Sequence, residues 1–182
     1  SFAGINLVTL ANNHIMDYGS AGLIDTLTLC RSKNISTVGV GTTVREASEP
    51  YFTTINNRKL AVLNCADDEF VTTPDHSYKC NSLDPVQLHN TITRIRNDVD
   101  YIIVIVHAGN EYYSLPSPRT KALYRFLVDC GADAVLANHS HAFSGYEVYK
   151  SKPVFYGLGN FIYDWPGKEE TSWYRGFVVR LR

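Results

Sequence analysis

The sequence predicts an α/β protein organised around a parallel β-sheet whose strand ends carry the functional residues. The first observation is a strand, a helix and a strand in succession: residues 101–106 (YIIVIV) are apolar, residues 117–130 show helical spacing, and residues 132–137 are apolar again. The second observation is that histidines follow three predicted strands, namely His14, His107, His139 and His141. Because ligands gather beyond the carboxyl ends of strands in open α/β sheets, we expect these side chains to converge in one crevice.

Composition bounds the classes of protein to which this chain can belong. Its 182 residues, 45% apolar and 12% aromatic, are about one domain long and supply a sizeable core, so residues 1–182 are treated as a single domain. The 17 basic and 18 acidic residues are well mixed, which leaves no electrostatic surface for nucleic acid, a partner we exclude. No apolar run approaches the roughly 20 residues that span a bilayer. The four cysteines include no CxxC pair, so the sequence does not indicate whether the protein lies in an oxidising or a reducing compartment. A disulfide between Cys65 and Cys80 stays possible.

The first part of the chain predicts alternating strands and helices. Residues 5–10 (INLVTL) form an apolar strand, and residues 20–33 follow at helical spacing from Ser20, a residue type that caps helices. Residues 37–41 predict a short buried strand, and residues 44–48 a helical turn.

The middle of the chain departs from this alternation. Residues 51–55 and 59–64 predict an antiparallel β-hairpin, since two apolar-rich runs are separated by a short polar turn. Residues 66–82 lack periodicity and predict a long loop that forms a lid or rim. Asp84-Pro85 then opens a helix, with proline in the first turn.

The last part of the chain continues with strands. Beyond the histidine pair, four stretches alternate between apolar and polar residues and predict strands of a second, more antiparallel sheet. They are residues 146–149, 153–156, 160–163 and 176–181.

The side chains after the strands are those of metal and acid–base chemistry. The Asn13 amide oxygen can coordinate a metal while the neighbouring His14 imidazole transfers a proton, although the pair also suits a turn. Asp17 either orients His14 or caps the following helix. His107 ends an apolar strand, where it is either a ligand or a buried core histidine, and Glu111 is a ligand, a general base or a solvated carboxylate.

Four sequence blocks resemble those of a known family. They are LANNHIMDYG at residues 10–19, IVHAGNEY at 105–112, GADAVLANHSH at 131–141 and VFYGLGNFIYD at 154–164. Together they are similar to the signature blocks of the bacterial capsule synthesis protein CapA family. That family is associated with poly-γ-glutamate capsule synthesis and belongs to the calcineurin-like metallophosphoesterase superfamily.

The resemblance implies a fold, a site and a cellular setting. The implied fold is a metallophosphoesterase-like two-sheet sandwich flanked by helices. The implied site holds divalent metal ions, two in the intact protein and of the Mn, Fe, Zn or Mg type. The implied metal ligands are Asn13, His107, His139 and His141. His14 is the implied catalytic residue, Asp17 and Glu111 are further catalytic candidates, and Gly159, Asn160 and Phe161 lie at the edge of the site. The implied location is the bacterial cell envelope, within a capsule synthesis membrane complex.

The sequence also departs from the superfamily pattern. Asn138 stands where Gly is usual, and the two carboxylate-bearing blocks that should precede Asn13 are absent. Two divalent ions bring four positive charges, whereas all four implied ligands are neutral, so a bridging carboxylate is required. We therefore expect that the fold lacks its N-terminal strands. The missing segment, or a second copy of the chain, is then expected as a partner at the exposed sheet edge.

Together with this resemblance, these observations predict that the intact protein is a metal-dependent phosphoesterase that acts on a phosphorylated or polyglutamyl capsule intermediate, and that this chain alone is impaired. One alternative is a protein with the same fold but no catalytic activity, which serves as a scaffold or export component of capsule assembly. A second alternative is a metal-dependent hydrolase or transferase of γ-glutamyl amide bonds.

Overall fold

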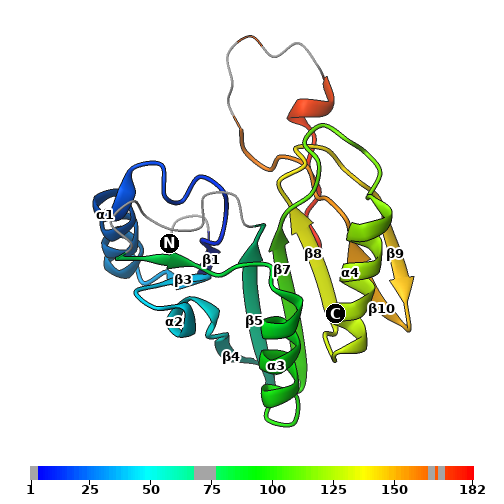
Figure 1. The fold of residues 1–182 in the computed structure, drawn as a ribbon, viewed down its shortest axis with the longest axis horizontal. Coiled ribbons are helices and arrows are strands. Elements are labelled where there is room, and N and C mark those ends of the chain that lie inside the picture. The colour runs from blue at the N-terminus through cyan, green and yellow to red at the C-terminus, as the bar shows by residue number, and fades with distance from the viewer. Residues whose placement is uncertain (1–3, 68–76, 164–166, 168–170) are drawn as a thin grey trace.

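A computed structural model of the chain describes residues 4–67, 77–163, 167 and 171–182. A six-stranded sheet forms its centre, and two small two-stranded sheets, β1-β2 and β3-β6, accompany it (Figure 1). The order of the central strands is β4 (Tyr51–Ile55), β5 (Arg58–Ala66), β7 (Tyr101–His107), β8 (Ala134–Asn138), β10 (Lys152–Phe155) and β9 (Tyr146–Tyr149). The predicted α/β class is confirmed.

Four central strands, from β5 to β10, run parallel, and the two outer strands run antiparallel to their neighbours. The predicted hairpin is confirmed: β4 pairs with β5 through Asn56 and Asn57, whose φ angles of 50° and 61° suit the tight turn. The assignment of residues 146–149 and 153–156 to a second sheet was wrong. Both strands extend the central sheet, because Val154 pairs in parallel with Val135 of β8.

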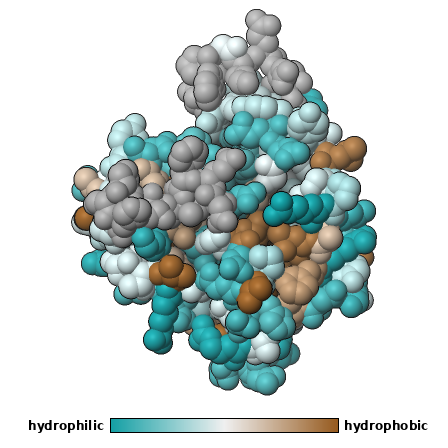
Figure 2. All heavy atoms as spheres, viewed as in Figure 1, coloured by the Kyte–Doolittle hydropathy of each residue, from teal (hydrophilic) through white to brown (hydrophobic). Residues whose placement is uncertain are grey.

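Two amphipathic helices cover one face of this sheet, α3 (Pro85–Ile95) and α4 (Pro118–Asp129) (Figure 1). Each begins as the sequence predicts, with a capping side chain followed by proline. Asp84 accepts hydrogen bonds from two backbone N–H groups, and Ser117 accepts one from Thr120. On the face viewed in Figure 2, hydrophobic side chains gather over the middle strands between α3 and α4, with hydrophilic side chains around them.

The alternation of β7 separates the two faces of the sheet. Ile102, Val104 and Val106 point to the helix-covered face and are fully buried. Ile103, Ile105 and His107 point to the other face, which is half-buried. The predicted site residue at the end of β7 therefore lies on the open face.

The N-terminal part forms a smaller layer beside β5. It contains β1 (Leu7–Thr9), α1 (Gly19–Ser32), β2 (Ser36–Val38), β3 (Val40–Gly41), α2 (Val44–Ser48) and β6 (Lys79–Cys80). Among the described strands β1 pairs with β2 alone, so the first predicted strand lies outside the central sheet. Helix α1 starts at Gly19 without a side-chain cap, and Ser20, the predicted cap, bonds Ser77 instead.

The predicted strand at residues 37–41 is split into β2 and β3, which join different sheets. The break falls at Gly39, which has a φ of 100°. A Cβ at this position would overlap Asn64 Oδ1 and would lie 2.8 Å from Ala11 Cβ. The close approach of Asn64 and Ala11 therefore requires glycine at this position. Here the chain passes from the β1-β2 sheet to the β3-β6 sheet.

The predicted strands at residues 160–163 and 176–181 do not form. Within the described residues, this region contains a 3₁₀ turn at Thr171–Tyr174 and an isolated bridge between Gly159 and Gly176. Of the predicted loop at 66–82, residues 68–76 lie outside the described residues, and β6 occupies part of the remainder.

All four cysteines are free thiols, so the Cys65–Cys80 disulfide is not formed. Burial raises the pKa of the Cys65 thiol and raises that of Cys80 to about 12, which keeps both thiols protonated. No helix in the described part of the chain is long and apolar enough to cross a membrane.

Candidate metal centre

Five of the predicted site residues form one continuous series of side-chain contacts. His14 Nδ1 lies 2.8 Å from Asp17 Oδ2, and His14 Nε2 lies 3.4 Å from Asn13 Nδ2. The other end of the Asn13 amide, Oδ1, lies 2.9 Å from His107 Nε2, which lies 3.2 Å from His139 Nδ1. Segments 94 and 32 residues apart are thus brought to one point.

A buried amide positions the first of these segments. Asn64, 1% exposed near the C-terminal end of β5, accepts a hydrogen bond from Ala11 N at 2.7 Å and donates one to Ile105 O at 3.1 Å. Ala11 lies two residues before Asn13, and Ile105 lies two residues before His107. One side chain therefore sets the relative position of two ligand-type residues. Sequence reasoning missed Asn64, although a lone amide inside a buried apolar strand is a usable signal.

The ends of β7 and β8 are aligned by their register. His107 pairs with Asn138, and Ala108 N donates to Asn138 O at 3.2 Å. After β8 the chain turns sharply, with φ of 100° at His139 and 54° at His141. Left-handed backbone costs about 1 to 3 kcal/mol at a non-glycine residue and is concentrated at functional sites. The turn presents both imidazoles beside the end of β7.

His107 is held neutral by its surroundings. Burial, and after it the neighbouring imidazoles of His139, His141 and His14, lower its pKa from 6.5 to about 4. Because Asn13 Oδ1 can only accept, the Nε2 of neutral His107 carries the proton of their hydrogen bond. Displacing that proton would expose a lone pair that points at the centre of the cluster.

His141 stands slightly apart, inside a group of aromatic rings. Its ring centre lies 6.4 Å from that of His139 and 4.9 Å from that of Trp173, on which it stacks. Tyr163 approaches edge-on at 5.3 Å, and Tyr112 stacks at 6.0 Å. Tyr112 and Tyr163 lie within two of the signature blocks but had no predicted role, and sequence reasoning missed Trp173, which lies outside the blocks.

The carboxylate candidates have different surroundings. Asp17 orients His14 and does not cap α1, whose N-cap position is Tyr18. Glu111 is exposed, and within the described residues no hydrogen bond or ion pair joins it to the histidines. Asp164, the last residue of the fourth signature block, lies outside the described residues.

The donor atoms fit a divalent metal ion in kind and in spacing. Ligand atoms about 2.1 Å from a metal lie about 3.0 to 3.4 Å from one another. The distance from Asn13 Oδ1 to His107 Nε2 is 2.9 Å, and that from His107 Nε2 to His139 Nδ1 is 3.2 Å. Both distances are close to this range. Nowhere in the described residues, however, do three His, Cys, Asp or Glu side chains meet to hold one ion. Among the residues that the structure describes, the cluster offers neutral donors that would suit one ion and no carboxylate placed to bridge to a second.

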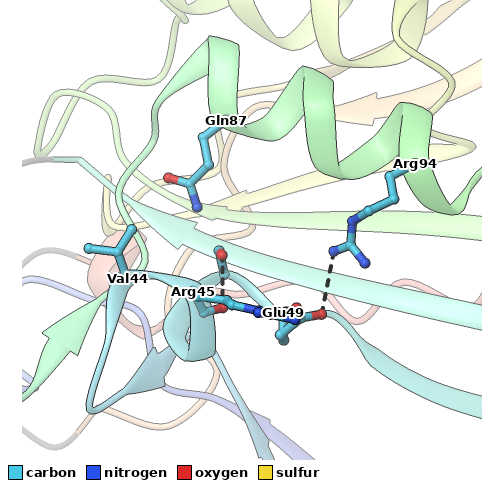
Figure 3. A pocket seen from close by; sticks show the side chains of 6 residues that line it. Val44, Arg45, Glu49, Gln87 and Arg94 are labelled. Atoms are coloured by element: carbon cyan, nitrogen blue, oxygen red, sulfur yellow. Dashed lines mark hydrogen bonds and ion pairs between the residues drawn. The ribbon is translucent and has the colours of Figure 1, made fainter.

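A separate surface pocket of about 470 Å³ lies between α2 and α3 (Figure 3). Its two arginines, Arg45 and Arg94, both pair with Glu49, at 3.8 and 3.4 Å. Their charge is therefore partly neutralised. None of the predicted site residues lines this pocket; its lining consists of Val44, Arg45, Ser48, Glu49, Gln87 and Arg94.

The chain is similar in sequence to known capsule biosynthesis proteins. Residues 1–165 match the family model described as bacterial capsule synthesis protein PGA_cap. The chain is 32% identical to the capsule biosynthesis protein CapA of Bacillus anthracis over 169 residues, which are 89% of this chain and 41% of that protein. It is 33% identical to the PGA biosynthesis protein CapA of Bacillus subtilis (strain 168) over 160 residues, 85% of this chain and 41% of that protein. The chain thus spans about two fifths of the length of these relatives.

Solved structures with a similar fold are metallophosphoesterase-like. A Staphylococcus aureus protein provisionally named a 5′-nucleotidase, in complex with α-ketoglutarate, matches with a TM-score of 0.63 and 18% identity over 85% of this chain and 32% of its own. The sulfate thiohydrolase SoxB of Thermus thermophilus, in complex with glycerol, matches with a TM-score of 0.60 and 13% identity over 85% of this chain and 28% of its own. The expected metallophosphoesterase-like fold and the family resemblance are confirmed, and the chain belongs to the bacterial capsule synthesis protein PGA_cap family.

Proposed function

We propose that this member of a poly-γ-glutamate capsule biosynthesis family carries a metal-dependent phosphoesterase-type site. The observation that supports the proposal best is the unbroken series of contacts from Asp17 through His14, Asn13 and His107 to His139. A metal donor set and an acid–base pair are adjacent in this series, as hydrolysis of a phosphate ester requires.

The proposed ligands divide by geometry into two positions. Asn13, His107 and His139 are adjacent and would hold one divalent ion of the Mn, Fe, Zn or Mg type, while His141, whose ring centre lies 6.4 Å from that of His139, would serve a second position. Bound divalent ions would polarise phosphoryl oxygens and lower the pKa of water. A second ion also needs a bridging carboxylate. We propose that it comes from a partner: another segment of the longer protein or a second copy of the chain.

His14 and Asp17 are the proposed acid–base pair. The Asp17 carboxylate accepts the Nδ1 proton of His14 at 2.8 Å, which fixes the orientation of the ring. His14 Nε2 faces the Asn13 NH₂, which can only donate, so this contact must open before Nε2 can carry a proton and give it to the leaving-group oxygen. The His14 side chain is 68% exposed, which leaves room for a substrate. Glu111, in the loop that follows β7, is a third catalytic candidate.

The proposed substrate is a phosphorylated or polyglutamyl capsule intermediate. The names of the Bacillus relatives, which refer to capsule and PGA biosynthesis, support this class of compound. We also propose a place in a capsule synthesis membrane complex at the bacterial cell envelope. The word capsule in the family's description and in the name of the Bacillus anthracis relative supports the setting at the cell envelope.

The test combines metal content with turnover. Elemental analysis of the purified protein and calorimetric titration with Mn²⁺ and Zn²⁺ should show binding, and the protein should release phosphate from an aryl phosphate. His139→Ala should lower metal affinity at least about tenfold. His89→Ala is the matched control, because His89 lies on α3 and contacts Cys130 and Phe126.

Two outcomes would contradict the proposal. Cleavage of a γ-glutamyl oligomer without cleavage of the aryl phosphate would favour the amide hydrolase or transferase. A protein that neither binds metal nor turns over either compound would favour the scaffold or export role.

A further inference from the structure

Asn160 joins His141 to the loop that carries Trp173. Its Oδ1 lies 2.7 Å from His141 Nδ1, and its Nδ2 donates to the backbone oxygen of Trp173 at 2.9 Å. The backbone of this segment is also held closely, since a Cβ at Gly176 would overlap Asn160 O. Asn160 is therefore fixed at both its main chain and its amide.

These contacts determine where the proton of His141 lies. A backbone carbonyl can only accept a hydrogen bond, so the group facing Trp173 O must be the NH₂ of Asn160. The group facing His141 is then the amide oxygen, which also can only accept. His141 Nδ1 must consequently be the protonated nitrogen, and Nε2 of the neutral ring keeps its lone pair.

The aromatic rings around His141 support the same orientation. Stacking on Trp173 and Tyr112, with the edge-on contact from Tyr163, restricts rotation of the imidazole about its own axis. Rotating the ring by half a turn would move Nδ1 away from Asn160 and leave the amide oxygen without this partner.

We propose that Asn160 is a positioning residue that holds the proton of His141 on Nδ1 and thereby presents Nε2 as a metal donor. The placement of the proton stands on the contacts of Asn160 alone. The purpose of that placement rests on the proposed metal-dependent function. A partner that fixes the tautomer of a ligating histidine typically changes metal affinity 10- to 100-fold.

The first experiment reads the tautomer directly in metal-free protein. Long-range ¹H–¹⁵N correlation spectra at about pH 8, where an ordinary imidazole of pKa about 6.5 is neutral, distinguish protonated Nδ1 from protonated Nε2. Wild-type protein should show the Nδ1-protonated form at His141. Asn160→Leu, similar in size but unable to accept, should convert it to a mixture of both forms. Asn160→Asp, which still accepts, should keep the proton on Nδ1.

The second experiment measures affinity for Zn²⁺ by calorimetry in the same variants. Because His141 would serve the second metal position, Asn160→Leu should weaken the second, weaker Zn²⁺ binding event about 10- to 100-fold and leave the first as in wild type. Asn90→Leu, on the exposed surface of α3, is the control and should change neither readout.

The outcomes separate the two proposals. A wild-type His141 protonated on Nε2, or an Asn160→Leu variant that keeps the Nδ1 proton, would overturn the role of Asn160 even if the protein binds metal. An Nδ1 proton that depends on Asn160, in a protein without metal affinity, would support the placement and overturn the proposed function.

Discussion

Replacing Asn64 by alanine tests how the first ligand segment is attached to the sheet. The variant loses the acceptor of Ala11 N–H and the donor to Ile105 O, and Ala11 is only 2% exposed. A buried donor left without a partner costs about 1 to 3 kcal/mol, and each ordinary hydrogen bond contributes about 1 kcal/mol. We expect a loss of about 2 to 4 kcal/mol in the free energy of unfolding, which lowers the melting temperature by roughly 4 to 16 °C.

The assay is urea unfolding of Asn64→Ala beside Asn90→Ala, an exposed helix substitution that should stay within about 0.5 kcal/mol of wild type. Amide hydrogen exchange adds a local readout, because the Ala11 N–H should exchange much faster in the variant. Metal affinity should fall as well, since Asn13 follows the loosened segment. An Asn64→Ala variant as stable as the control, with Ala11 still protected, would refute the reasoning.

Three further predictions concern titratable side chains. His107 has a folded pKa of about 4, below its unfolded 6.5, so the unfolded state takes up a proton first and stability should fall by up to about 3 kcal/mol between pH 6.5 and 4. Urea titrations in chelator should show this slope, and His107→Gln should remove it. The hydrogen bonds from Arg125 lower the pKa of Glu147 to about 2, so its contribution is present above pH 4.5 and is lost as pH falls toward 2. Glu147→Gln should therefore be less stable at neutral pH and less sensitive to acid, as thermal melts would show. Asp17→Asn should lower phosphate release about 10- to 1000-fold with metal affinity unchanged; a large change in metal affinity would mean that Asp17 is a ligand.

Local residue patterns predicted much of the central fold. Each of the correct predictions rests on contacts between residues that are close in the chain. Examples are the apolar runs of β7 and β8, the helix caps at Asp84 and Ser117, and the turn at Asn56. Their effect on the backbone is therefore visible in the sequence.

Patterns along the chain could not assign strands to sheets. Alternation tells which side chains share a face but not which strand is the neighbour, so residues 146–149 and 153–156 were placed in the wrong sheet. At residues 37–41 the break depends on how closely Asn64 and Ala11 approach Gly39. Residues 176–181 alternate like a strand but form no ladder in the described structure.

The sequence by itself determined which side chains could bind metal, because their position after strand ends and the four signature blocks are local properties. Only the tertiary structure decided which of them meet and what holds them. Asn64 and Asn160 act on residues 53 and 19 positions away. Glu111, which a signature block contains, is exposed and makes no hydrogen bond or ion pair with the histidines among the described residues. The physical reason is that a hydrogen bond requires its atoms within about 3 Å. That distance, between residues remote in the chain, is set by the packing of whole elements.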